Sequence, residues 1–122
     1  MTAALVTVID DDESVRESLP DLLRSFGFAA QAFASGEDFL ASTLLGTTKC
    51  LVLDVAMPGM SGPDLKQELE RRKQPIPVIF ITAHQDNMTC ERLKQQGAID
   101  CLYKPFDPSA LIRAVRTALP ST

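Results

Sequence analysis

The sequence predicts an α/β fold: a five-stranded parallel sheet with helices on both faces. Short apolar runs rich in β-branched residues alternate with longer segments whose apolar residues recur at helical spacing. This strand-then-helix alternation is typical of a parallel sheet covered on both faces, and right-handed crossovers leave few possible topologies. The 122 residues suffice for one hydrophobic core. We therefore expect residues 1–122 to form a single domain.

Five segments have the pattern of buried strands. The clearest is the first, a short continuous run rich in β-branched residues. The second is weaker, because alanine and glutamine interrupt it. The predicted strands are Leu5–Ile9, Ala30–Phe33, Cys50–Leu53, Val78–Ile81 and Cys101–Tyr103.

Helical spacing follows each predicted strand. Ser35, with Asp38 three residues later, gives a short helix around residues 37–42 a capped start. Asp107 and Pro108 supply an N-cap and a first-turn proline for the last helix. The apolar residues that mark the other helix faces are Val15, Leu19, Leu22, Leu23 and Phe26; then Leu65 and Leu69; and finally Leu111, Ile112, Val115, Ala118 and Leu119.

The fourth predicted helix, Asn87–Gln96, has the poorest apolar face. Only Met88 and Leu93 are available to anchor it, and Gly97 is placed to end it. We expect this helix to be the least well held of the five.

Composition excludes several classes of protein. The chain is 45% hydrophobic and 23% charged, which is ordinary for a globular domain. Its net charge of −4 and the lack of a Lys/Arg cluster argue against direct nucleic-acid binding. No apolar run approaches the roughly 20 residues of a membrane-spanning helix. Met1–Val6 has no basic region typical of a signal peptide. We expect a cytoplasmic protein without membrane association.

The three cysteines show no recognisable pairing pattern. The spacing of Cys50, Cys90 and Cys101 predicts neither a zinc site nor a disulfide framework. Cys50 and Cys101 stand among apolar residues of predicted strands, where cysteine packs as a small hydrophobic side chain.

Distinctive polar residues stand at the ends of the predicted strands. Asp10–Asp12 follow the first strand, Asp54 the third, Thr82 the fourth and Lys104 the fifth. All strands of a parallel sheet end at the same edge, where ligands bind. These four segments are therefore expected to converge, although each alone could be only a helix cap, a turn or a strand stop.

The convergence favours phosphoryl transfer. Carboxylates within about 4 Å repel by roughly 4 kcal/mol per pair at an effective dielectric of 20, which a divalent cation offsets. A small set of oxygen ligands suits Mg²⁺ better than Ca²⁺. Asp54 would then be the nucleophile, while Lys104 and Thr82 would contact phosphoryl oxygens.

Four motifs carry a resemblance to a known family. They are Val8–Glu13 (VIDDDE), Leu53–Gly62 (LDVAMPGMSG), Ile81–His84 (ITAH) and Lys104–Phe106 (KPF). Together they resemble the response-regulator receiver family, of CheY-like and flavodoxin-like fold. The resemblance runs from about Leu5 to Leu119 and is strongest to the FixJ-like group. It implies the strand order 2-1-3-4-5.

The resemblance implies a role for each acidic residue. Asp54 is expected to be the phosphoacceptor. Asp10 and Asp11 are expected to hold Mg²⁺, together with Asp54 and the backbone carbonyl of Ala56. Asp12, by position, is not expected to be a ligand.

Three further expectations come from the resemblance. Thr82 and Lys104 would contact the phosphoryl group, and Lys104–Pro105 would be a cis peptide. His84, two positions past Thr82, would tune the attack of water on the phosphoaspartate.

The sequence departs from the family pattern at one position. Receivers commonly place Phe or Tyr three residues before the active-site lysine, where it changes rotamer on phosphorylation. Here that position is Cys101, which is too small for the role. Tyr103 lies two residues further, so strand alternation predicts that it points to the same side.

The resemblance also implies partners and an output. We expect a sensor histidine kinase as phosphoryl donor and a phosphorylation-dependent homodimer through the fourth helix and fifth strand. Full-length members of the group usually carry a helix-turn-helix DNA-binding domain, so transcription would be controlled by a domain absent from this chain. The domain itself would catalyse only its own phosphorylation and dephosphorylation, and so is not an enzyme with an outside substrate.

Other classes of function remain open at this stage. A phosphatase of the haloacid-dehalogenase type would use Asp10 as nucleophile and Asp12 as acid/base, but it leaves Asp54 and Lys104 only partly used. An interaction module that works without phosphorylation would not need the acidic site. A flavodoxin-type flavin site ranks last, because no phosphate-cradling loop is present.

Overall fold

The computed structural model describes residues 3–83 and 87–119, except for the side chain of Asn87. Its centre is a five-stranded parallel sheet with the order β2-β1-β3-β4-β5. The predicted fold class and strand order are therefore confirmed. The strands are β1 (Leu5–Ile9), β2 (Ala29–Phe33), β3 (Cys50–Asp54), β4 (Val78–Thr82) and β5 (Asp100–Tyr103).

Five α-helices connect and follow the strands, together with one short 3-10 helix that the sequence did not predict. They are α1 (Glu13–Ser25), α2 (Gly36–Leu40), η1 (Thr43–Gly46), α3 (Gly62–Arg71), α4 (Asn87–Gln95) and α5 (Pro108–Ala118). The predicted caps are present: the Ser35 side chain accepts a hydrogen bond from the Asp38 backbone, and Asp107 accepts one from the Ser109 backbone. Gly97, at φ 105°, follows the end of α4 as expected.

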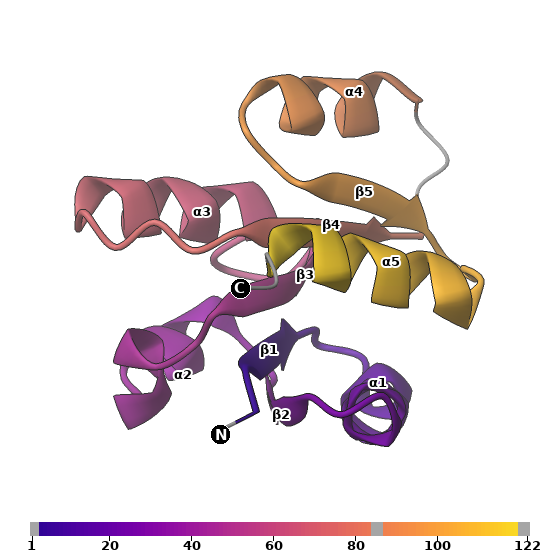
Figure 1. Ribbon diagram of the computed structural model, residues 1–122. Coiled ribbons are helices and arrows are strands. Elements are labelled where there is room, and N and C mark those ends of the chain that lie inside the picture. Colours follow the sequence, from indigo (N-terminus) through magenta and orange to yellow (C-terminus); the bar gives the residue numbers. More distant parts are fainter. Residues whose placement is uncertain (1–2, 84–86, 120–122) are drawn as a thin grey trace.

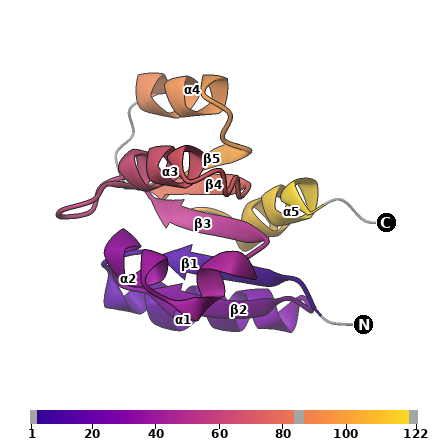
Figure 2. The same ribbon diagram turned by 90° about the vertical axis from the view of Figure 1, so that its left-hand side faces the viewer.

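The helices cover the two faces of the sheet in separate groups (Figures 1 and 2). α1 and α5 pack on one face, where Leu23 and Leu111 are fully buried against β1, β3 and β4. α2, α3 and α4 pack on the other, where Phe39 and Leu65 are fully buried. The sheet is thus the middle layer of three, and the chain has one core layer on each side of it.

Strand register places the predicted site residues at one edge. Ile9 is opposite Leu53, so Asp10 and Asp54 follow directly on neighbouring strands. Thr82 is opposite Tyr103, which places Lys104 just beyond it. Figure 2 shows the arrowheads of β1 and β3 pointing to the same side, which is the side of the site.

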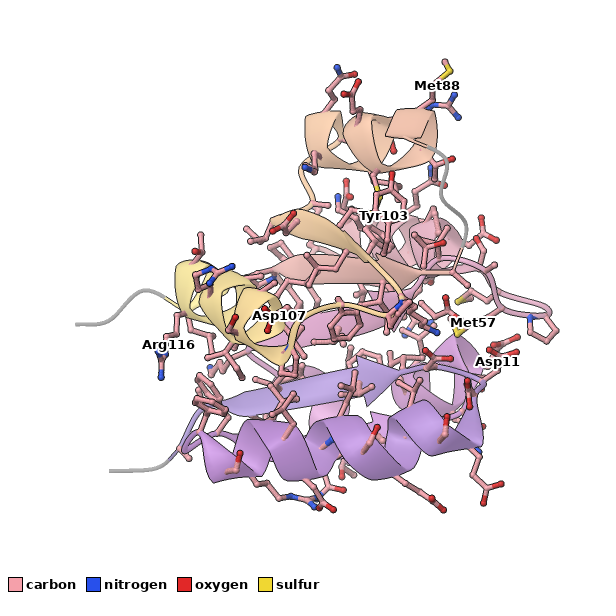
Figure 3. The ribbon with its side chains drawn as sticks, turned by 90° about the vertical axis from the view of Figure 1, so that its right-hand side faces the viewer. Asp11, Met57, Met88, Tyr103, Asp107 and Arg116 are labelled. Carbon is pink, nitrogen blue, oxygen red and sulfur yellow. A yellow bond between two sulfur atoms is a disulfide. The ribbon has the colours of Figure 1, made fainter. Side chains whose placement is uncertain are left out.

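The anchoring of α4 differs from the prediction. Leu93 is buried as expected, but Met88 is 70% exposed and points away from the sheet (Figure 3). The second buried side chain of α4 is Cys90, which is bonded to Cys101 of β5. The expectation of no disulfide is therefore wrong, and Cys101 is not simply a packed apolar side chain. Cys50 is a free, fully buried thiol, as predicted.

None of the helices in residues 3–83 and 87–119 is both long enough and apolar enough to cross a membrane.

Candidate functional site

Three carboxylates meet beyond the ends of β1 and β3. Each of Asp10, Asp11 and Asp54 offers one oxygen, and these oxygens lie within 4.8 Å of one another. Asp10 is fully buried and Asp54 is 6% exposed, whereas Asp11 is exposed to solvent. Figure 3 shows Asp11 at the edge of the sheet toward which β1 runs, on the same side as Met57. The site is therefore an acidic cluster that is open to solvent at Asp11.

Asp10 is held by contacts to both its side chain and its backbone. One carboxylate oxygen accepts a 2.7 Å bond from the Lys104 ammonium, and the other accepts a 2.9 Å bond from the backbone N–H of Asp12. The guanidinium of Arg16 donates to the Asp10 carbonyl at 3.0 Å. These contacts compensate the burial of a charged group, which is costly when the group is unpaired.

Lys104 reaches a second carboxylate of the cluster. Its Nζ lies 4.0 Å from Oδ2 of Asp54, so one ammonium stands beside both buried acids. The backbone N–H of Lys104 donates to the carbonyl of Thr82 at 2.8 Å, which ties the ends of β4 and β5 together. The Lys104–Pro105 peptide is cis, as expected. Thr82 is 2% exposed at the end of β4.

The surroundings of Asp54 shift the pKa of its carboxyl group. Burial and, after it, the neighbouring charge of Asp10 raise the pKa of Asp54 to about 7, although Lys104 and the backbone N–H of Ala56 oppose the shift. Neutral protonated and charged forms of this carboxyl are thus close in free energy near neutral pH. A further cation at the cluster would favour the charged, nucleophilic form.

Asp12 has a structural role. It is the N-cap of α1, and its carboxylate accepts bonds from the backbone N–H and the hydroxyl of Ser14 at 2.9 and 2.8 Å. These hydrogen bonds from Ser14 lower the pKa of Asp12. Its carboxylate is not part of the cluster formed by Asp10, Asp11 and Asp54. That the third acid of the run is not a metal ligand stays a prediction.

Gly62 supports the site from behind. A Cβ atom at this position would lie 2.3 Å from the backbone oxygen of Asp54 and 3.0 Å from the Phe80 ring, which no side chain could tolerate without a shift. The backbone N–H of Gly62 also donates to the carbonyl of Val55 at 3.0 Å. The first residue of α3 therefore packs directly against the strand end that carries Asp54.

Sequence reasoning missed the site roles of Arg16 and Gly62. Arg16 follows Asp10 by six positions, and only the first turn of α1 brings the two together. Gly62 was recognised only as the last residue of the motif Leu53–Gly62, and its close approach to Asp54 depends on packing between elements. The position of His84 lies outside the described residues, so the expectation for it stays untested.

Tyr103 and Cys101 lie on the same side of β5, as strand alternation predicted. Both belong to the core layer beneath α2, α3 and α4, Cys101 buried and Tyr103 partly buried. Figure 3 shows Tyr103 between the sheet and α4. The aromatic side chain thus stands close to the position at which receivers commonly carry one.

The donor set fits a hard divalent cation. All three clustered groups offer carboxylate oxygens, the ligand type that Mg²⁺ prefers, and the exposure of Asp11 leaves room for coordinated water. Lys104 supplies a single positive charge against three acids. The residues present therefore match a site for Mg²⁺ better than a closed site made only of protein ligands.

The fold and this acidic cluster define a class of signalling domain. The family described as response regulator receiver domain matches residues 6–116. The chain belongs to this family, whose members are the receiver domains of two-component response regulators.

Relatives place the chain among regulators of the FixJ-like kind. Nodulation protein W of Bradyrhizobium diazoefficiens is 47% identical over 117 residues, which are 96% of this chain and 52% of that protein. The transcriptional regulatory protein FixJ of Azorhizobium caulinodans is 45% identical over 114 residues, 93% of this chain and 54% of that protein. The chain thus spans about half the length of the curated relatives it matches.

Solved structures agree with the fold. The crystal structure of FixJ-N is 36% identical, superposes with a TM-score of 0.85 and covers both chains fully. The response regulator StyR is 45% identical with a TM-score of 0.86, covering 94% of this chain and 58% of that chain.

Proposed function

We propose that this domain receives a phosphoryl group on Asp54 from the phosphohistidine of a sensor kinase. The observation that carries the proposal is the position of the Asp54 carboxylate, which clusters with two other acids and lies 4.0 Å from the Lys104 ammonium. A carboxylate nucleophile, a metal-binding pair of acids and a fixed cation are the parts that phosphoryl transfer requires.

The residues have distinct tasks in this reaction. A carboxylate oxygen of Asp54 attacks phosphorus, and the bond from phosphorus to the histidine nitrogen breaks. The nitrogen keeps the electron pair, and an acyl phosphate forms on Asp54. Lys104 offsets charge on a phosphoryl oxygen, and the hydroxyl of Thr82 donates a hydrogen bond to another. Hydrolysis of the acyl phosphate returns the domain to its resting state, so the domain acts on no outside substrate.

Mg²⁺ would be held by Asp10, Asp11 and Asp54, with the backbone carbonyl of Ala56 as a further ligand. When bound, it supplies positive charge that lets an anionic phosphoryl group approach the acidic cluster. The all-oxygen cluster and the raised pKa of Asp54 support this assignment.

The output is proposed to be dimerisation through α4 and β5, with control of transcription by an attached DNA-binding domain. Two observations support it: the helix has few buried side chains, and the relatives include a transcriptional regulatory protein of about twice the length. An element with few buried contacts is easily biased by a local change of charge. The acidic net charge of −4 favours a protein partner over direct binding of DNA by this domain. A cytoplasmic location follows from a kinase partner of this kind.

Intact-mass spectrometry with acetyl phosphate and Mg²⁺ tests the proposal. The wild-type chain is expected to gain one phosphoryl group, and omission of Mg²⁺ or the substitution Asp54→Asn is expected to abolish the gain. Sedimentation of the same samples then tests the output. A chain that gains no phosphoryl group under these conditions would contradict the proposed function.

A further inference from the structure

A disulfide joins α4 to β5 beneath the proposed output surface. Cys90 and Cys101 are 11 positions apart, and their Cα atoms lie 5.4 Å apart. At this separation two cysteines bond without any backbone movement, so the same backbone accommodates the dithiol and the disulfide. The side chains are 4% and 6% exposed within one core layer. The bond therefore lies inside the contact between the helix and the sheet.

This bond is a large part of what holds α4 in place. Of the described side chains of the helix, Met88 to Gln95, only Cys90 and Leu93 are buried. Further contacts include the exposed ion pair of Lys94 with Asp100 of β5 at 3.8 Å and, just after the helix, the bond from Lys66 of α3 to the carbonyl of Gln96 at 3.0 Å. A helix with two buried side chains opens at low free energy unless it is tied covalently. The state of this one bond therefore changes how firmly α4 is held on the sheet.

The strand at the other end of the bond also carries site residues. β5 continues from Cys101 through Tyr103 to Lys104, whose ammonium contacts Asp10 and stands 4.0 Å from Asp54. The Lys104 backbone is hydrogen-bonded to Thr82. When the disulfide is present, α4 is held on the strand that carries these site residues, and when it is absent the helix can move without the strand.

We propose that Cys90 and Cys101 form a reversible redox modification site that sets how far α4 responds to phosphorylation. The part of this inference that concerns phosphorylation rests on the proposed function. In a reducing compartment thiols are kept free, and disulfides there are typically transient and redox-sensing. The resting pair is then a dithiol with a mobile α4, and oxidation fixes α4 on β5 and blocks the output.

The chemistry requires an oxidant, which we assign as a hydroperoxide. The thiolate of one cysteine attacks the peroxide oxygen and breaks the O–O bond, giving a sulfenic acid and, with hydrogen peroxide, one water. The second thiol displaces the sulfenic hydroxyl as another water, and the S–S bond forms. Two electrons and two protons leave the protein. A dithiol reductant such as reduced thioredoxin or dithiothreitol returns them by thiol–disulfide exchange.

Cys50 provides a matched control within the same chain. It belongs to the core layer on the opposite face of the sheet, beside α1 and α5. Burial raises the pKa of its thiol to about 12, so the reactive thiolate is scarce at neutral pH. Cys50 lies in the other core layer, across the sheet from Cys90 and Cys101, so it is expected not to exchange with them.

The first test counts thiols in the wild-type protein. The chain is treated with hydrogen peroxide or dithiothreitol, then denatured and alkylated, and labels are located by peptide mass spectrometry. Oxidised protein is expected to carry a label on Cys50 alone, reduced protein on all three cysteines, and the change to be reversible in the folded state. Free Cys90 and Cys101 after oxidation, or a bond that resists reduction in the folded protein, would overturn the inference.

The second test measures hydrogen exchange of peptides from α4 in both redox forms, with and without acetyl phosphate and Mg²⁺. The phosphoryl adduct is followed by mass in the same samples. We expect the adduct in both forms, but a phosphorylation-dependent change in α4 exchange that is about fivefold or more larger in the reduced form. Equal changes in both forms would overturn the redox inference alone. No adduct in either form would overturn the proposed function and, with it, the coupling.

Variants separate the bond from general effects of oxidation. Cys90→Ser is expected to respond to phosphorylation equally under oxidising and reducing conditions, whereas Cys50→Ser keeps the redox dependence of the wild type. Because both positions are buried and either variant could fold poorly, the comparison of the two wild-type forms decides the matter. By reciprocity of coupled equilibria, phosphorylation must shift the thiol–disulfide equilibrium in glutathione buffer toward the dithiol. No shift would contradict the coupling.

Discussion

Lys104 pairs with Asp10 more closely than with Asp54: its Nζ lies 2.7 Å from Oδ2 of Asp10 and 4.0 Å from Oδ2 of Asp54. The ammonium thus neutralises the fully buried acid while it remains within reach of the proposed phosphoacceptor. This relationship links stability to function, because the same cation compensates a buried charge and stands where phosphoryl oxygens would arrive.

Removing the ammonium should destabilise the metal-free protein. Lys104→Met leaves Asp10 buried without its ion-pair partner, and we expect the free energy of unfolding to fall by about 3–5 kcal/mol in urea titrations with chelator present. Mg²⁺ should recover part of the loss. The exposed pair of Lys94 and Asp100, at 3.8 Å, gives the control, since Lys94→Ala should change stability by less than about 1 kcal/mol. Equal effects of the two substitutions would contradict this account.

The raised pKa of Asp54 predicts how stability depends on pH without metal. The carboxyl has a pKa of about 7 in the folded state against an ordinary 3.8. Between these two pKa values the folded state binds a proton that the unfolded state lacks. The stabilisation that this bound proton gives to the folded state is therefore lost as pH rises toward and through 7.

Asp54→Asn removes this titration. At pH 8 in chelator, the variant should be more stable than wild type by about 1–3 kcal/mol, and at pH 4 the difference should vanish. Mg²⁺ should reverse the order at pH 8. Denaturant titrations of both proteins across this pH range measure the difference in their free energies of unfolding. If that difference were the same at every pH, the pKa of Asp54 would not be raised.

The contact of Gly62 with Asp54 predicts a steric requirement. In Gly62→Ala the new Cβ would lie 2.3 Å from the backbone oxygen of Asp54, so the strand end or α3 must move. We expect a loss of about 1–3 kcal/mol in stability, typical of overpacking, and a lower yield of phosphoryl adduct. Gly46→Ala, which meets no atom within 4 Å, is the matched control and should leave both unchanged.

Substitutions of the adjacent acids Asp11 and Asp12 should distinguish metal binding from helix capping. Asp11→Ala removes one oxygen of the cluster, and the Mg²⁺ concentration for half-maximal phosphorylation should rise on the order of tenfold or more, equivalent to at least about 1.4 kcal/mol. Asp12→Ala removes the N-cap of α1 and should cost about 1 kcal/mol of stability while phosphorylation persists. Loss of phosphorylation in Asp12→Ala would instead favour a D-x-D phosphatase.

Sequence reasoning predicted those parts of the fold that depend on local pattern. Strand runs, the caps at Ser35 and Asp107, and the order of polar residues at strand ends are properties of neighbouring residues, and the structure contains them. The convergence of Asp10 with Asp54 followed from topology, because parallel strands end together.

Features that depend on distances between elements were not predictable in this way. The bond between Cys90 and Cys101 requires their Cα atoms to approach within 5.4 Å, and no spacing rule encodes that. For the same reason Met88 was wrongly assigned as an anchor of α4. The sequence of this nine-residue helix does not determine which of its faces packs on the sheet, and the buried face is that of Cys90 and Leu93.

The most direct test of the central claim is to locate the phosphoryl group chemically. Borohydride reduces an aspartyl phosphate to homoserine, which tandem mass spectrometry then assigns to a position. After phosphorylation with acetyl phosphate and Mg²⁺, the account predicts homoserine at position 54 and nowhere else. Homoserine at position 10 would contradict it and favour a phosphatase-like nucleophile, and so would a chain in which no position is reduced.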